Sequence, residues 1–319
     1  MIGSIDIGGT KTLVGLVDRG RIVIHERFAT VTESWQEHFE QASLRLEKLC
    51  ERAGWQTDSL DGIGVSLPGM VNESRGVLLL APYAGWKNVP ARDFFRRRLK
   101  NTNVFVENDV NACAVGEWTL GHAKGMQDFL WVTVSTGVGG AVMANGRLVH
   151  GAAQVAGEIG HVKVEFAAPR PCTCGQEGCL EAHASGTAIS REFTQYIEKT
   201  PEAAQRCAAL QLPIDARGCR MLADDGDAGA ARILGDAARW LGRGLSAALN
   251  LLNPEAVFIG GGVGQSLDVL LPGIREVIAQ EVVTPARSVP ILYTKLGYNA
   301  AFLGAACLPE YERRKQHDF

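Results

Sequence analysis

Hydrophobic residues follow two rounds of one pattern, in which short apolar runs flank a glycine turn and longer amphipathic segments come after. Apolar runs bounded by glycine predict strands, and apolar residues spaced three and four apart predict helices. The predicted strands are 2–7, 12–17, 21–27, 62–65, 104–106, 129–134, 141–143, 256–259 and 289–293. The predicted helices are 34–53, 112–120, 226–252, 267–281 and 299–308. The repeated pattern predicts an α/β protein of two domains with a cleft between them.

The domain boundaries follow from where the second round begins. We expect a small N-terminal domain at 1–110, to which a C-terminal helix of about 299–319 returns, and a large domain at 111–298. Within the large domain, the segment 199–225 contains Pro201 and Pro213, and we expect it to be a lid or a flexible insert.

Composition narrows the function classes. The chain has 319 residues, enough for two cores, and a net charge of −3, which argues against nucleic acid as a partner. No signal peptide opens the sequence, and the uncharged run 129–146 contains four glycines, so it predicts strand–turn–strand rather than a membrane span. We therefore expect a cytoplasmic protein with no membrane partner. Glycine is the outlier at 37 residues, and its excess is expected in turns and ligand loops.

Three glycine-rich turns each close an apolar strand, at 6–11, 135–140 and 260–262. In the first, the exposed amides and the Thr10 hydroxyl could donate to a phosphate, and Asp6 could hold Mg²⁺ through water. An ordinary hairpin turn is the alternative for any one of them. The third lies where a nucleoside docks in an α/β sheet. Together they predict a nucleotide cleft, and no P-loop motif competes with it.

A metal site is predicted by one histidine and three closely spaced cysteines: His161, Cys172, Cys174 and Cys179. One imidazole and three thiolates complete a tetrahedral zinc site without an open position, so the site would be structural. Gly175 and Gly178 would allow its tight turns. The alternative is a chance grouping of reduced cysteines.

Carboxylates surround the predicted zinc site. Glu158 and His161 are three residues apart, and Glu181 comes two residues after Cys179. Such carboxylates could accept the hydroxyl protons of a polyol, although they could equally be surface glutamates in a loop.

A further carboxylate, Asp109, ends the predicted strand 104–106 in the sequence Glu107-Asn108-Asp109. It could orient a substrate hydroxyl and accept its proton during phosphoryl transfer, with Asn108 and Asn111 as hydroxyl-binding neighbours. The alternative is that Asp109 caps the helix that follows, and the two roles are compatible.

Taken together, these motifs resemble the ROK family (repressors, open reading frames and kinases), which includes bacterial sugar kinases of the actin-like ATPase, ribonuclease H-like fold. The resemblance extends from Asp6 to about Ala306. It rests on the motifs Asp6-Ile-Gly-Gly-Thr-Lys11, Leu67-Pro-Gly69, Glu107-Asn-Asp109, Thr136-Gly-Val-Gly-Gly140, Gly157-Glu-Ile-Gly-His161, Cys172-x-Cys-Gly-x-x-Gly-Cys-Leu-Glu181 and Gly260-Gly-Gly262.

The resemblance implies roles for the motif residues. Asp109 would be the general base, and His161 would use one ring nitrogen for zinc and the other for a sugar hydroxyl. The implied sugar-binding residues are Gly69, Asn108, Asp109, Glu158, His161 and Glu181. The implied residues at the ATP phosphates are Asp6, Gly8, Gly9, Thr10, Lys11, Thr136, Gly137, Val138, Gly139 and Gly140, with Gly260 and Gly261 near the nucleoside. ATP, Mg²⁺ and structural Zn²⁺ are the implied cofactors, and a homodimer is implied because dimers are common among relatives.

The implied activity is phosphorylation of a hexose at its primary hydroxyl. Glucose leads on family frequency, with N-acetylmannosamine, N-acetylglucosamine, fructose and mannose as alternatives. Tyr83 stands where family glucokinases often carry an asparagine that touches the sugar, which puts glucose in question. A sugar-sensing regulator without turnover is the alternative from another class; family regulators carry a DNA-binding domain before the first glycine turn, and none is expected here. A filament-forming or chaperone ATPase is disfavoured because the zinc motif would then have no purpose.

Overall fold

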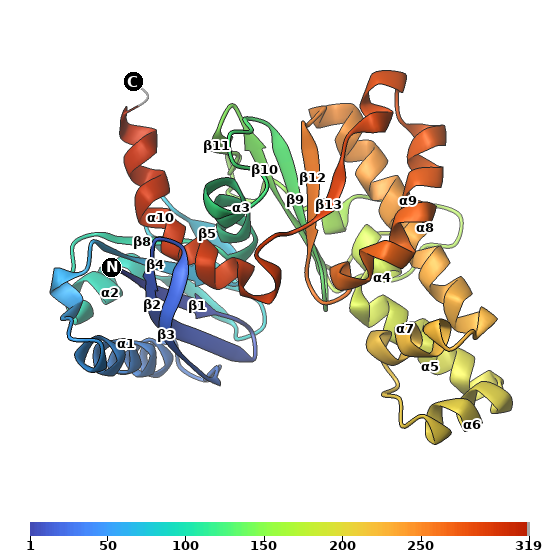
Figure 1. Ribbon diagram of the computed structural model, residues 1–319, viewed down its shortest axis with the longest axis horizontal. Helices are drawn as coiled ribbons and strands as arrows, with labels where there is room; N and C mark the ends of the chain where they lie inside the picture. Colours follow the sequence, from blue (N-terminus) through green and yellow to red (C-terminus); the bar gives the residue numbers. More distant parts are fainter. Residues whose placement is uncertain (318–319) are drawn as a thin grey trace. The chain divides into compact units, whose positions relative to one another are not determined.

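The computed structural model describes residues 1–317, which form two compact units (Figure 1). The first comprises Met1–Gln127, Val142–Ala156 and residues 294–317, and the second comprises Asp128–Ala141 and Gly157–Tyr293. The chain therefore passes from one unit to the other at more points than the two predicted boundaries, which were at 110 and 298. Among residues 1–317, no helix combines the length and the apolar character needed to cross a membrane.

The first unit is built on a five-stranded sheet in the order β3-β2-β1-β4-β8. Its strands are β1 (Ile2–Ile7), β2 (Lys11–Asp18), β3 (Arg21–Ala29), β4 (Gly62–Leu67) and β8 (Val104–Asn108). The first three pair antiparallel as a meander, whereas β1, β4 and β8 run parallel, so their carboxyl ends share one edge. Asp6 on β1, Ser66 on β4 and Glu107 on β8 are register partners near that edge.

Helices cover both faces of this sheet because successive residues of β1 point to opposite sides. Gly3 faces Leu46 of α1 (Trp35–Arg52), whereas the Ser4 hydroxyl donates to the Phe302 carbonyl of α10 (Ala300–His317) at 2.6 Å. Helix α3 (Asp109–Leu120) packs along α10, which groups it with the first unit.

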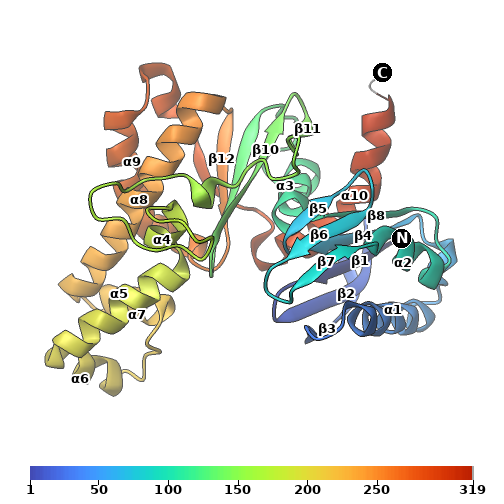
Figure 2. The same ribbon diagram turned by 180° about the vertical axis from the view of Figure 1, so that it is seen from behind.

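A smaller antiparallel sheet, seen from behind in Figure 2, also belongs to the first unit. It consists of β5 (Met70–Asn72), β6 (Val77–Ala81) and β7 (Trp86–Val89), followed by α2 (Ala91–Leu99). The pattern of hydrophobic residues did not predict these three short strands or α2.

The second unit contains most of a sheet in the order β11-β10-β9-β12-β13. These strands are β9 (Phe129–Val134), β10 (Val138–Ala144), β11 (Arg147–Leu148), β12 (Ala256–Gly260) and β13 (Ile291–Tyr293). Its helices are α4 (Leu180–Ala184), α5 (Gly186–Lys199), α6 (Pro201–Ala209), α7 (Ala216–Asp224), α8 (Ala228–Leu252) and α9 (Leu267–Glu281). Short 3₁₀ turns lie at Thr57–Ser59, Ile159–His161, Gly264–Ser266, Thr284–Ser288 and Gly297–Asn299.

The segment 199–225, expected to be a lid or a flexible insert, forms the two helices α6 and α7 instead (Figure 1). Pro201 does not break structure here; it lies in the first turn of α6, where a missing N–H costs nothing. Asp215 caps α7 by accepting from the Arg217 and Gly218 amides, each at 2.9 Å. Cys207 and Leu222 are buried in a cluster shared with α5 and α8, so the segment is part of a core.

Candidate active site and metal centre

The first glycine turn joins β1 to β2 in the first unit. The Gly8 amide donates to the Lys11 carbonyl at 2.9 Å, and the Thr30 hydroxyl donates to the Gly8 carbonyl at 2.7 Å. These bonds fix a tight hairpin whose residues Gly9 to Lys11 are exposed. The prediction of a glycine turn here is confirmed, and its exposed tip can receive a ligand.

Asp6 lies just before this turn, inside the sheet. The Ser66 hydroxyl donates to its Oδ1 atom at 2.5 Å. Burial raises the pKa of Asp6 to about 6, because desolvation outweighs the Ser66 hydrogen bond and the charge of Arg27. Such a carboxyl gains from a cation beside it, which is the chemistry expected of a residue that holds Mg²⁺ through water.

Asp109 begins α3 at the carboxyl end of β8. The helix is capped by Asn108, whose Oδ1 accepts from the amides of Val110 at 2.9 Å and Asn111 at 3.1 Å. The alternative role considered for Asp109, the cap itself, therefore belongs to Asn108. The Asn108 Nδ2 atom donates to the Gly69 carbonyl at 2.9 Å and to Asp109 Oδ1 at 3.1 Å, which orients the carboxylate.

Asp109 and Asp6 both lie close to Cys113. The buried thiol of Cys113, on α3, has its pKa raised first by burial and then by the charges of Asp109 and Asp6. The two carboxylates thus lie along the edge where the parallel strands end, which is where ligands bind in α/β sheets.

Tyr83 lies in the β6–β7 turn beside the first glycine turn. A Cβ placed on Gly9 would be 3.7 Å from the Tyr83 ring, and the ring centroid is 5.8 Å from that of Trp86. Burial, and after it the charge of Asp109, raises the pKa of the Tyr83 phenol well above its usual value. The phenol is therefore neutral and within electrostatic range of Asp109.

The second glycine turn, in the second unit, is shorter than predicted. The structure ends it at Gly137, and Val138 to Gly140 already belong to β10. The Val138 amide donates to Glu181 Oε2 at 3.0 Å, and a Cβ on Gly137 would overlap that same oxygen. Glycine is needed at this position because the Glu181 carboxylate packs against the backbone.

A cavity of about 790 Å³ opens beside this turn within the second unit. Its walls come from the turn itself, from α5 and α7, and from the loop after β12. The lining residues include Thr136, Thr187, Arg217, Gly262 and Gln265. Its volume is in the range of small-ligand sites. Of the third glycine-rich turn, only Gly262 lines the cavity; Gly260 and Gly261 do not.

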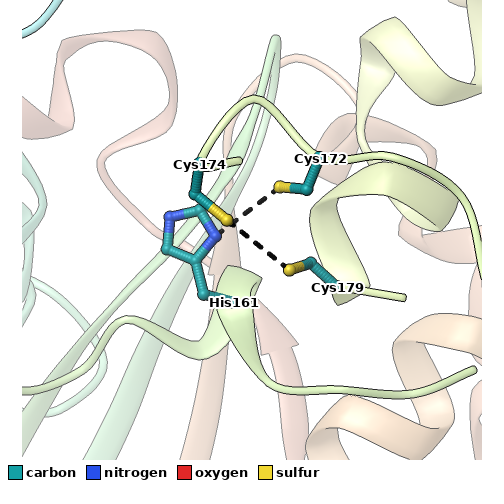
Figure 3. A group of neighbouring side chains, drawn as sticks. All are labelled: His161, Cys172, Cys174 and Cys179. Carbon is teal, nitrogen blue, oxygen red and sulfur yellow. Dashed lines mark hydrogen bonds between the residues drawn. The ribbon is translucent and has the colours of Figure 1, made fainter. Parts of the chain in front are cut away.

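The four predicted zinc ligands come together (Figure 3). Their ligand atoms all lie within 4.8 Å of one another; the Cys174 and Cys179 sulfurs are 3.7 Å apart, and the Cys172 sulfur is 3.8 Å from His161 Nδ1. Tetrahedral zinc with Zn–S bonds of about 2.3 Å places sulfurs roughly 3.8 Å apart, so this donor set fits zinc. Lys163 donates to the Cys179 sulfur at 3.2 Å, which would offset the negative charge of three thiolates.

The predicted sugar-binding carboxylates surround this group. His161 Nε2, on the side of the ring away from Cys172, lies 4.0 Å from Glu158 Oε2. Although half of the Glu158 side chain is exposed, its pKa is raised, because desolvation together with the charge of Glu181 outweighs the lowering effect of His161. Glu181 Oε1 accepts from the Thr173 hydroxyl at 2.9 Å. Thr173, which lies between two of the predicted zinc ligands in the sequence, thereby orients Glu181, a predicted sugar-binding residue.

Sequence reasoning gave no role to several residues that shape the site, among them Ser66, Glu107, His150 and Thr173. Glu107 belongs to the motif Glu107-Asn108-Asp109, and its position as a charged residue in an otherwise apolar strand could have indicated a role. Ser66 and His150 carried no comparable sign, because their partners are distant in the sequence.

The two α/β units, with their glycine turns, the Asp109 carboxylate at the end of a parallel strand and the Cys₃His group, have the features expected from the sequence for a sugar kinase. A model of the ROK family matches residues 2–312, and the chain belongs to that family. The predicted actin-like ATPase type of α/β fold is confirmed by solved ROK kinases.

Relatives and solved structures agree with this assignment. The chain is 37% identical to a glucokinase of Halalkalibacterium halodurans over 68% of this chain and 66% of that protein, and 31% identical to a Thermotoga maritima glucokinase over 95% of each. The crystal structure of a ROK family glucokinase from Streptomyces griseus in complex with glucose and AMPPNP matches with a TM-score of 0.82 and 32% identity, covering 96% of this chain and 98% of that one. A ROK family transcriptional regulator, a homolog of the E. coli MLC protein, matches with a TM-score of 0.85 and 26% identity, covering 97% of this chain and 78% of that chain.

Proposed function

We propose that the protein transfers the γ-phosphoryl group of ATP to the primary hydroxyl of a hexose, with Asp109 as general base. The observation that carries this proposal is the setting of Asp109. Its carboxylate is held by the Asn108 amide at the end of a parallel strand, close to Asp6 and the first glycine turn. Full-length similarity to glucokinases supports the same reaction.

In the proposed mechanism, the oxygen of the sugar hydroxyl attacks the γ-phosphorus of ATP while Asp109 accepts the hydroxyl proton. The bond between the γ-phosphorus and the β–γ bridging oxygen breaks, and ADP leaves. The family resemblance assigns the binding of the sugar hydroxyls to Gly69, Asn108, Glu158, His161 and Glu181. Mg²⁺, held through water by Asp6, would neutralise phosphate charge. Zinc would hold the loop that carries His161 and Glu181 and take no part in the chemistry.

The cavity beside Thr136 is the proposed site of the nucleoside. The family resemblance assigns contacts with the ATP phosphates to residues 136–140 and to the exposed turn of Gly8 to Lys11. The Streptomyces griseus glucokinase binds AMPPNP, which supports ATP as the phosphoryl donor. Because Gly262 lines the cavity, we assign the nucleoside contact of the third turn to Gly262; Gly260 and Gly261, to which the family resemblance gives that role, do not line the cavity.

Glucose is the proposed sugar because the similar Streptomyces griseus glucokinase was solved in complex with glucose, whereas Tyr83 is the residue that puts this choice in question. Its neutral phenol next to Gly9 brings a bulky ring to the edge of the site, which would suit a different epimer or an N-acetylated sugar. Coupled ADP-release assays with glucose, mannose, fructose, N-acetylmannosamine and N-acetylglucosamine would identify the substrate. A protein that binds sugar and AMPPNP yet releases no ADP with any of them would be a regulator instead.

The general base is tested by Asp109→Asn. We expect kcat to fall by a factor of about 10² or more, in line with the loss of a positioned base, while the unfolding midpoint stays close to that of the wild type. Asp58→Asn, at an exposed aspartate in the turn Thr57–Ser59, serves as the matched control and should leave kcat unchanged. A folded Asp109→Asn protein with nearly full activity would refute the assignment.

A further inference from the structure

Glu107 is a charged residue beside the proposed base that the mechanism does not use. Only 3% of its surface is exposed. Its Oε1 atom accepts from the backbone amide of Asn108 at 2.8 Å and from Asn111 Nδ2 at 3.1 Å. Glu107 therefore binds the first turn of α3 at two points, on both sides of Asp109 in the sequence.

The other carboxylate oxygen of Glu107 meets His150, whose Nε2 lies 2.7 Å from Oε2. His150 follows β11 in the segment Val142–Ala156 of the first unit. The charged groups that face it are Glu107 on β8, Glu73 in the turn between β5 and β6, with Oε1 3.9 Å from His150 Nδ1, and Lys315 on α10, 3.6 Å from Glu73. Burial lowers the pKa of His150, but the hydrogen bond with Glu107 and the nearby carboxylates raise it above its ordinary value.

A buried carboxylate is stable only when its charge is matched and its oxygens are hydrogen-bonded. In Glu107 one oxygen holds the turn that leads into α3, and the other is held by His150. Without His150 one oxygen of the buried carboxylate would lose its hydrogen-bond partner, and a side chain that turned to find another partner would lose its bond to the Asn108 amide. The position of the Asp109 carboxylate depends on that turn, because Asn108 holds Asp109 directly.

We propose that His150 is a positioning residue for the phosphoryl-transfer base: through Glu107, it fixes the turn from β8 into α3 that aims Asp109. This inference rests on the proposed function, since it takes Asp109 as the base. His150 touches neither sugar nor nucleotide in this scheme. Its effect should therefore appear in kcat rather than in KM.

The first experiment compares His150→Ala with His150→Gln, in which the amide can still donate to Glu107. We expect His150→Ala to lower kcat by about tenfold to a hundredfold, the cost of a small misplacement of a catalytic group, with little change in KM for sugar or ATP. His150→Gln should recover most of kcat. Glu73→Gln, which leaves the Glu107–His150 pair intact, is the matched control and should stay close to the wild type. A folded His150→Ala protein with wild-type kcat overturns the proposal.

The second experiment is independent of turnover. Hydrogen–deuterium exchange of the full-length protein should show faster exchange over 104–112 in His150→Ala, because the Asn108 amide loses its fixed acceptor, and no such change in Glu73→Gln. If His150→Ala does not fold, the test uses Glu107→Gln, whose side-chain oxygen can still accept from the Asn108 amide but carries no buried charge. In the double variant Glu107→Gln/His150→Ala, the loss of His150 should then change kcat and hydrogen exchange little. Unchanged exchange in His150→Ala, or equal losses with and without the Glu107 charge, overturns the proposal. A wild-type protein that phosphorylates no sugar is the separate failure of the proposed function.

Discussion

The contact between α3 and α10 yields the sharpest stability prediction, because the two helix backbones meet at glycines. A Cβ placed on Gly304 of α10 would lie only 1.9 Å from the carbonyl oxygen of Ala112 on α3. Gly116, one turn further along α3, faces Gly304 in the same way, with 2.9 Å from its own Cβ position to the Gly304 Cα atom. Neither glycine has a positive φ, so close approach alone explains them.

Gly304→Ala sets two terms against each other. The better helix propensity of alanine stabilises by about 1 kcal/mol. The clash is with backbone, which cannot rotate away, so the helices must separate by roughly 1.5 Å to restore an ordinary contact of about 3.4 Å. Overpacking of this kind costs about 1–3 kcal/mol and occasionally more. Because the shift needed is large, we expect the clash to win and the free energy of unfolding to fall by about 2 kcal/mol.

The assay is urea unfolding of Gly304→Ala beside Gly235→Ala, a glycine of α8 whose added Cβ would have no neighbour nearer than 4.0 Å. Gly235→Ala should be stabilised by up to about 1 kcal/mol, as propensity alone dictates. Since α3 begins at Asp109, Gly304→Ala should also lower kcat. If Gly304→Ala proves as stable as Gly235→Ala, the inference that this helix contact is closed by backbone is wrong.

Two further predictions concern charge and metal. The pKa of Asp6 is about 6 in the folded protein against an ordinary 3.8, so the folded state holds an extra proton between about pH 4 and 6, and stability falls as the pH rises through that window, by up to about 3 kcal/mol. Asp6→Asn should therefore unfold at higher urea than the wild type at pH 7.5 without Mg²⁺, with the advantage gone by pH 4; a less stable variant at pH 7.5 contradicts this. Metal analysis should find about one zinc per chain, and Cys174→Ser or a chelator should lower Tm by several degrees, because a structural zinc site contributes to folding. A chelator should not lower the Tm of Cys174→Ser further, and metal-free protein of full stability contradicts the assignment.

Long periodic elements were predictable from the sequence. The helix expected at 267–281 is α9 with the same bounds, and the one expected at 34–53 is α1, capped by Ser34, whose hydroxyl accepts from the Glu37 amide at 3.2 Å. These elements are long enough for apolar spacing to identify the buried face. The grouping of the four predicted zinc ligands was predictable for a different reason, since their residue types and close spacing in the sequence are those of a zinc site.

Close backbone packing could not be predicted. Gly242 and Gly244 of α8 had no explanation in the sequence, where they only weaken a helix. In the structure a Cβ on Gly242 would lie 2.7 Å from Val277 Cβ on α9, and one on Gly244 would collide with Leu180 on α4. The reason for each glycine is a neighbour that becomes adjacent only in the folded chain.

In the candidate site, too, the sequence reveals the functional groups but not the residues that set their pKa and orientation. Motif residues reveal which groups are present, but the partner that sets the state of each group is distant in sequence: Ser66 for Asp6 at a separation of 60 residues, and His150 for Glu107 at 43. Glu181 is likewise bound by Val138, 43 residues away. A relative could keep every motif and still differ in base strength or turn geometry if these partners change. Differences in pH dependence and sugar preference within the family should therefore be sought at these partner positions before the motifs themselves.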